Sequence, residues 1–117
     1  MDLDQAIDLH SEWRWKFCSA MAREEAMDAL SIANDDGCEL GKWLHGEAKN
    51  HFGHLASYAR CVARHAAFHV EAGKVASIVN AGQYAQAEAM IGPDTPYSSA
   101  STAVRNALLA LKEEAGI

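Results

Sequence analysis

Residues 52–80 read FGHLASYARCVARHAAFHVEAGKVASIVN. Apolar and aromatic residues recur in this stretch at every third or fourth position, which is the spacing of one face of an α-helix. The sequence NAGQ at residues 80–83 is typical of a helix end. The stretch therefore predicts one long helix from about Phe52 to Asn80. Its predicted buried face consists of Leu55, Tyr58, Val62, His65, His69, Ala72, Ala76 and Val79.

The same spacing predicts a helix at the N-terminal side, from near Leu3 to about Ala33. The sequence ANDDG at residues 33–37 ends it, because Asn, Asp and Gly favour turns and caps. Its predicted buried face consists of Leu3, Ile7, His10, Trp13, Phe17 and Met21.

A short helix is predicted between these two, roughly from Cys38 to Leu44. Asp35 or Asp36 is the expected N-cap, since a carboxylate accepts hydrogen bonds from the free N–H groups of a first helical turn. The polar sequence HGEAKN at residues 45–50 then connects the short helix to the long one.

Two more helices are predicted after the long one. The first spans residues 84–91 and stops at the Gly-Pro pair of residues 92–93. The second runs from Pro96 or Tyr97 to Ala115, and its apolar side carries Val104, Leu108 and Leu111.

No strand pattern competes with these helices, and runs of β-branched residues are absent. The expected fold is all-α, an antiparallel four-helix bundle with a short extra helix that carries a cysteine. A length of 117 residues predicts one domain that spans residues 1–117.

Composition narrows the class of protein. The formal net charge is -6 and no basic cluster is present, which argues against a nucleic-acid partner. No apolar run approaches the length of a membrane span, and the acidic N-terminus is unlike a signal peptide. The three cysteines do not form a disulfide pattern, so we expect a cytoplasmic protein with reduced thiols and no membrane insertion.

Three histidines fall on the predicted buried faces of the two longest helices. His65 and His69 are four residues apart and therefore share one helix face, and His10 lies on the first helix. Cys38 begins the short helix, where the backbone dipole favours a thiolate. Three imidazoles and one thiolate would form a closed tetrahedral zinc site.

Other interpretations of these residues stay open on spacing alone. Three separately hydrogen-bonded core histidines with a buried structural cysteine would fit the same pattern. A rival ligand set consists of Cys61, His65 and His69, although a small buried hydrophobe is the favoured interpretation of Cys61. Cys18 is expected to be a core residue, and the three tryptophans, Trp13, Trp15 and Trp43, are expected to be core or interface residues. His45, His51 and His54 are expected to lie mainly on the solvated surface, with His51 and His54 as a weak second metal pair.

The sequence does not favour an enzyme. A zincin requires HExxH, but the residues between the two histidines are Ala66, Ala67 and Phe68. Glu-x-x-His pairs of a diiron bundle are not found around these histidines. A cysteine–histidine nucleophilic pair has no supporting signature around Cys38.

Three motifs together resemble the chemoreceptor zinc-binding domain family. They are AIDLHSEW (residues 6–13), CELGKWL (residues 38–44) and ARHAAFHVEAGKV (residues 63–75), and they follow the family's pattern of His-x-x-Trp, Cys-x-Leu-Gly-x-Trp and His-x-x-x-His. The resemblance covers essentially the whole chain. The Cys-x-Leu-Gly-x-Trp motif is its most specific part.

The resemblance implies a helical bundle in which one zinc ion is bound by His10, Cys38, His65 and His69. It implies that Cys18 and Cys61 are not ligands, and that the residues supporting the site are Trp13, Gly41 and Trp43. Members of the family usually belong to bacterial cytoplasmic signalling proteins such as chemoreceptors and diguanylate cyclases, and often form homodimers.

The resemblance also implies a sensory role, in which the domain responds to zinc or to oxidants such as hypochlorous acid at the redox-reactive Cys38. The alternative is a zinc-stabilised structural or dimerisation module with no sensing role. The chain departs from the usual setting of the family because it contains no signalling coiled coil and no cyclase domain.

Overall fold

The computed structural model describes all 117 residues and contains eight α-helices and no strand, which confirms the all-α prediction. None of the helices is both long enough and apolar enough to span a membrane. The helices are α1 (Leu3–Ser11), α2 (Trp13–Arg23), α3 (Ala29–Ala33), α4 (Glu39–His45), α5 (Glu47–Phe52), α6 (Ala56–Asn80), α7 (Tyr84–Met90) and α8 (Pro96–Ala115).

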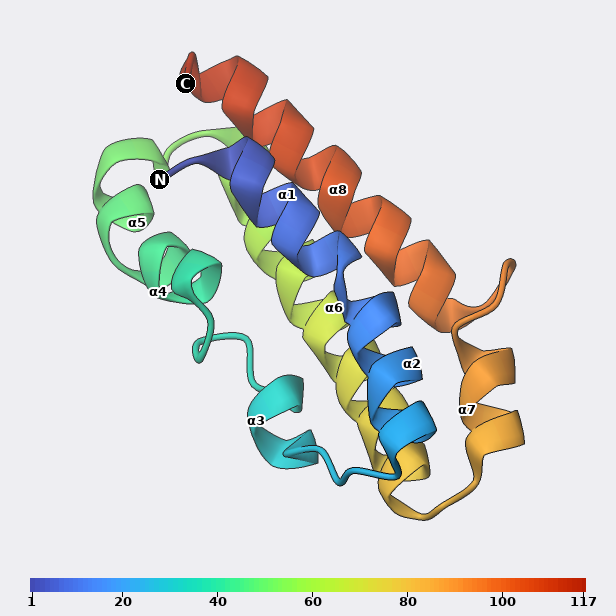
Figure 1. Ribbon diagram of the computed structural model, residues 1–117. Coiled ribbons are helices and arrows are strands. Elements are labelled where there is room, and N and C mark those ends of the chain that lie inside the picture. Colours follow the sequence, from blue (N-terminus) through green and yellow to red (C-terminus); the bar gives the residue numbers. More distant parts are fainter.

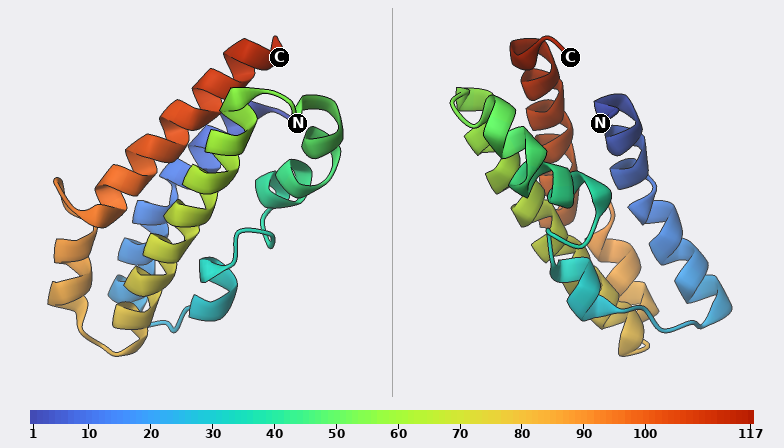
Figure 2. Two further views of the ribbon diagram at one scale, coloured as in Figure 1. Left: turned by 180° about the vertical axis from the view of Figure 1, so that it is seen from behind. Right: turned by 90° about the vertical axis from the view of Figure 1, so that its left-hand side faces the viewer.

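The bundle is organised around α6, the longest helix (Figure 1). α8 packs antiparallel along α6, and the nearly continuous α1 and α2 lie beside this pair. The chain then returns along another side of α6 through α3, α4 and α5, as the two views of Figure 2 show. These three short helices form the broken fourth side of an antiparallel bundle, and α7 links the ends of α6 and α8.

The core lies between α6, α8 and the paired α1 and α2. Leu108 and Leu111 of α8 are fully buried, and Val104 is almost so, as the apolar spacing predicted. The rings of Phe17 and Phe68 both pack against Tyr97, with centroids 5.8 and 5.7 Å apart respectively. Helical spacing predicted the burial of Val104, Leu108, Leu111 and Phe17. It did not predict the burial of Phe68, Tyr97 and several small residues of α6.

The predicted first helix is interrupted and does not continue to Ala33. It ends at Arg23, where Glu24 takes the left-handed conformation with φ of 53°. The Glu25 N–H donates to the Ala20 carbonyl and closes the helix end. Such an end usually carries glycine, so the sequence REEAMD at residues 23–28 gives no signal of it.

The predicted polar connection is also wrong, because residues 47–52 form α5. Glu47, Ala48 and Lys49 are good helix formers, and Ala48 is fully buried against the core. The long helix consequently begins at Ala56 instead of Phe52. The last two helices were predicted to within one residue, and the Thr95 side chain caps α8 by accepting from the Ser98 N–H.

Candidate metal centre

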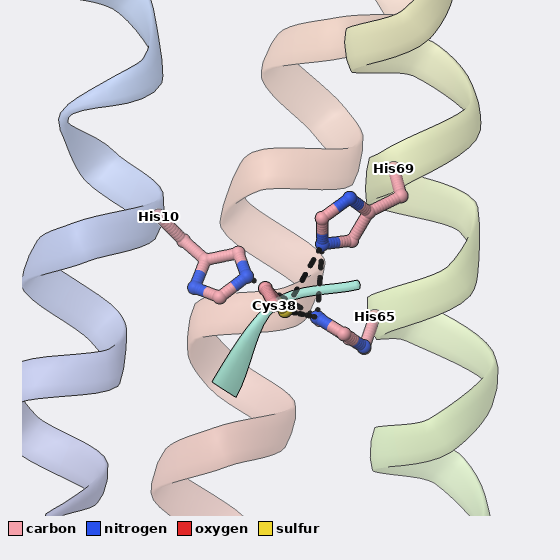
Figure 3. Close-up of side chains that lie close together, drawn as sticks. All are labelled: His10, Cys38, His65 and His69. Carbon is pink, nitrogen blue, oxygen red and sulfur yellow. Dashed lines mark hydrogen bonds between the residues drawn. The ribbon is translucent and has the colours of Figure 1, made fainter. Parts of the chain in front are cut away.

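Four side chains from three separate parts of the chain converge in the bundle (Figure 3). His10 comes from α1, His65 and His69 come from α6, and Cys38 directly precedes α4. One nitrogen or sulfur atom from each residue lies within 4.8 Å of all the others. The three histidines are buried and Cys38 is half-buried. Such a group can hold a metal ion.

Four of the six separations within the group are close to the edges of a small tetrahedron. His65 Nε2 lies 3.2 Å from His10 Nε2, 3.0 Å from His69 Nε2 and 3.3 Å from Cys38 Sγ. Cys38 Sγ lies 3.6 Å from His69 Nε2. Zinc bonds of about 2.0–2.3 Å would place four ligand atoms roughly 3.3–3.6 Å apart, which is close to these four separations, and the other two are no longer than 4.8 Å.

Backbone carbonyls set the orientation of two of the rings. His10 Nδ1 lies 2.7 Å from the Ala6 carbonyl oxygen, and His69 Nδ1 lies 2.8 Å from that of Ile32. Since a carbonyl only accepts, Nδ1 must carry the hydrogen in both rings. In each neutral ring Nε2 is then a lone-pair donor that faces the centre of the group. Two unprotonated nitrogens aimed at one point are suited to a cation.

His65 is the most confined member of the group. Its side chain is fully buried, and its Nδ1 has no hydrogen-bond partner within the chain. Burial lowers the pKa of His65 to about 3, and the neighbouring His69 and His10 contribute to this shift. Burial also lowers the pKa of His10. Both rings are therefore neutral at pH 7 and have a lone pair available for a metal.

Cys38 is the N-cap of α4. Its Sγ accepts a hydrogen bond from the Gly41 N–H at 3.3 Å, so the prediction of Asp35 or Asp36 as the cap is wrong. Cys38 is the cap, in place of Asp35 or Asp36, because it is the residue directly before the first helical turn. Burial raises the pKa of Cys38, and the N–H donated by Gly41 acts in the opposite direction. A bound cation would add to the second effect and favour the thiolate.

Gly41 lets the loop before α4 lie directly on the helix. A Cβ at this position would overlap the Asp35 carbonyl oxygen and lie 2.8 Å from the carbonyl carbon. Asp35 also pairs with His45 at the other end of α4, at 3.0 Å. The Tyr58 hydroxyl donates to the Leu44 carbonyl at 2.7 Å and connects α4 to α6. The position of Cys38 therefore depends on contacts at both ends of α4.

Trp13 and Trp43, the two expected supporting tryptophans, are half-buried. The Trp13 ring packs on Phe17 with centroids 5.7 Å apart, and the Trp43 ring packs on Phe52 at 6.2 Å. Trp13 also lines a groove of about 170 Å³ between α1 and the start of α4, which reaches His10 and Cys38. Solvent therefore has a route to the sulfur from this side.

The rival ligand set is not assembled. Cys61 is fully buried, is absent from the converging group, and has a pKa that burial raises to about 12. This confirms its interpretation as a small hydrophobe. Cys18, expected in the core, is exposed because Phe17 and Met21 take the buried face of α2.

The other histidines lie on the surface as expected. His45, His51 and His54 are all exposed. Neither His51 nor His54 is part of a group of three or more potential ligands, so their spacing does not build a second metal centre.

The groups that orient the candidate ligands are the backbone carbonyls of Ala6 and Ile32, and they were not predicted. Every residue has a backbone carbonyl, so the residue type at these positions does not identify them. A weak signal exists at Ala6, because a histidine in a helix faces the carbonyl four residues earlier. Ile32 lies 37 residues before His69, so only the tertiary fold reveals that contact.

Comparison with known proteins agrees with the geometry. The family model described as "Chemoreceptor zinc-binding domain" matches residues 10–76, a range that includes all four converging residues and more than half of the chain. No curated protein and no solved structure matches the chain. From the converging histidines and cysteine and the extent of this match, we conclude that the chain belongs to the chemoreceptor zinc-binding domain family.

Proposed function

We propose that this chain is a zinc-binding regulatory domain of bacterial signal transduction, in which His10, Cys38, His65 and His69 bind one zinc ion. The observation that carries the proposal is the pair of Nε2 lone pairs, fixed by backbone carbonyls, that face a thiol and a third imidazole. Imidazole and thiolate ligands suit zinc, whereas magnesium and calcium prefer oxygen.

The closed ligand set supports a regulatory role over a hydrolytic one. Four protein ligands leave a tetrahedral ion no position for an activated water. When bound, zinc would supply a cross-link between α1, the start of α4 and α6. The residues of the chain hold the ligands in place, through the carbonyls of Ala6 and Ile32 and the N–H of Gly41.

The short helices beside the site are suited to a metal-dependent change. α3, α4 and α5 contain 5, 7 and 6 residues, and isolated helices of that length are not stable in water. Their order depends on packing and on Cys38. Loss of zinc, or oxidation of its thiolate, is therefore expected to loosen this side of the bundle and to change its contacts with a partner.

The surface offers apolar side chains for such a partner. Trp15 of α2 is 69% exposed and Leu30 of α3 is 87% exposed, while Val70 of α6 is 48% exposed. These residues support pairing with a second copy of the chain or docking on a signalling protein. Movement of α3 would carry Leu30 with it.

The first test is the metal content of the protein purified without added metal. We expect about one zinc ion per chain, and a Cys38→Ala variant that loses it or binds it at least about 100-fold more weakly, because one of four ligands is missing. Elemental analysis and competition with a chromogenic chelator measure the two quantities. Cys18→Ala is the matched control, because it also removes one thiol but from an exposed position.

Two outcomes would contradict the metal assignment. One is a folded parent protein that neither contains nor takes up zinc. The other is equal zinc affinity in the Cys38→Ala and Cys18→Ala variants. A dissociation constant far below the concentration of exchangeable zinc in the cell would instead favour the alternative, a purely structural or dimerisation module. The same closed geometry also fits that module.

The second test concerns the oxidant response. Hypochlorous acid is expected to oxidise the zinc-bound thiolate of Cys38 to a sulfenic acid, a much weaker ligand, with release of zinc. Because Cys18 is exposed and would react independently, the experiment uses a Cys18→Ser background. Mass spectrometry of Cys38 is compared with zinc release on the same time scale. Release of zinc without modification of Cys38, or modification of Cys38 with zinc retained, would refute this switch.

A further inference from the structure

Helix α3 lies directly against α6 at Gly73. A Cβ atom on Gly73 would lie 2.6 Å from the Ala33 Cβ and 3.0 Å from the Ala33 Cα. These distances are shorter than real Cβ contacts, so the approach requires glycine at this position. Glycine is among the poorest helix formers, and Gly73 lies inside a helix of 25 residues. Its presence is therefore explained by the contact with α3.

This contact is adjacent to the group that orients a candidate ligand. Ala33 directly follows Ile32, whose carbonyl oxygen lies 2.8 Å from His69 Nδ1. Gly73 lies four residues after His69 and so shares its helix face. The separation between the two helices at Gly73 thus sets the distance between the Ile32 carbonyl and the His69 ring.

Helix α3 depends on such contacts for its position, because it is only five residues long. The chain just before its first turn is held at Met27, whose N–H donates to the Asn80 side-chain oxygen at 2.7 Å and whose carbonyl accepts from the Asn80 amide at 2.7 Å. Its last residue, Ala33, lies against Gly73. The Ile32 carbonyl lies between these two anchors, nearer the second.

We propose that Gly73 is a positioning residue of the metal centre: its missing side chain lets α3 approach α6, and the Ile32 carbonyl then holds His69 with Nδ1 protonated and Nε2 free for the ion. Gly73 is not one of the four converging residues. It acts through Ala33 and Ile32. The part that concerns metal affinity rests on the proposed zinc function, whereas the part that concerns the ring does not.

The test compares four proteins: the parent, Gly73→Ala, Ala33→Gly, and the double variant that carries both changes. Gly73→Ala should displace α3 and weaken zinc binding by about 10–100-fold, the usual effect of losing the partner of a metal-ligating histidine. Ala33→Gly removes the Cβ on the opposite side. The double variant should recover part of the affinity, because it removes the 2.6 Å approach between the two Cβ atoms and leaves only the 3.0 Å approach to the Ala33 Cα.

The ring itself is measured in metal-free protein by the ¹⁵N chemical shifts of the His69 nitrogens. The parent and the double variant should show the Nδ1-protonated form, and Gly73→Ala should show a mixture of the two neutral forms. A general loss of stability would not change these shifts. If the parent does not bind zinc, the proposed function fails, but the ¹⁵N measurement still tests the role of Gly73.

The proposal is overturned if Gly73→Ala keeps the parent's zinc affinity and the Nδ1-protonated His69. It is also overturned if the double variant remains as weak as Gly73→Ala. Should Gly73→Ala fail to fold by circular dichroism, the double variant and the metal-free parent carry the test. The double variant must then fold and the parent must show the Nδ1-protonated His69, and an unfolded double variant or a mixed His69 ring in the parent would refute the proposal.

Discussion

Replacing Gly41 with alanine is expected to weaken zinc binding as much as the loss of one ligand would. The added Cβ would overlap the backbone of Asp35, which cannot rotate away as a flexible side chain can. The loop and α4 must separate, and this moves Cys38 away from the histidines and breaks its hydrogen bond with the Gly41 N–H. We expect at least about a 100-fold loss of zinc affinity, equivalent to the removal of a ligand.

Gly37 provides a matched control for this variant. It lies in the same loop, and a Cβ there would meet nothing closer than 3.9 Å. Gly37→Ala should therefore keep the parent's zinc affinity. Isothermal titration in the presence of a competing chelator gives both affinities, and circular dichroism checks that the helices persist. Equal affinity in the two variants would show that the close approach at Gly41 is not needed to hold Cys38.

Replacing His65 with leucine is expected to have a large effect on zinc affinity and a small one on the stability of the metal-free fold at pH 7. Zinc affinity should fall by at least about 100-fold, since His65 Nε2 is within 3.3 Å of all three other candidate ligand atoms. The stability of the metal-free fold at pH 7 should change by no more than about 1 kcal/mol, because removal of the unpartnered Nδ1 is offset by loss of the hydrogen bonds of His65 Nε2 with His10 and His69.

The same variant should remove part of the acid sensitivity of the metal-free protein. The pKa of His65 is about 3 in the folded chain and 6.5 in the unfolded chain, so between these values the unfolded state binds more protons. The stability of the parent therefore decreases as the pH falls from 6.5 towards 3, by up to about 1.4 kcal/mol per pH unit for this residue. In the His65→Leu variant this contribution is absent.

Denaturant unfolding of the chelator-treated proteins at pH 7 and pH 5 measures both effects. His54→Leu is the control for the exchange of residue type, because His54 is exposed and outside the converging group. A metal-free His65→Leu protein that is several kcal/mol less stable than the parent at pH 7 would show that the hydrogen bonds of His65 Nε2 outweigh the cost of its unpartnered Nδ1.

The sequence predicted the candidate site better than the path of the chain around it. Helical spacing placed His10, His65 and His69 on buried faces, and the resemblance connected them with Cys38. The prediction was possible because a histidine among the apolar residues of a helix face is unusual, and because two residues four apart in a helix lie on the same face. The convergence of the three segments, in contrast, is a property of the tertiary structure.

The errors occurred where backbone geometry overrides residue type. The helix end at Glu24 uses a left-handed conformation without glycine, and α5 forms in a stretch whose polarity resembles that of a loop. The cap of α4 is a thiol, which is not among the common capping residues. The role of Gly73 was equally invisible, since spacing shows its helix face but not the partner that approaches it.

Helix α8 supplies none of the four converging side chains, although it is a principal packing partner of α6. In a description with two states, zinc-bound and zinc-free, α6 and α8 pack against each other in both. Zinc then changes only the positions of α1, α3 and α4 relative to this pair. Reversing a population from 1:99 to 99:1 requires about 5.5 kcal/mol of differential binding. A single ligand contributes about 3 kcal/mol, roughly a quarter of a structural zinc site. Loss of the Cys38 ligand alone would therefore give only a graded shift in population, so a complete shift requires the release of the ion that is expected to follow oxidation of Cys38.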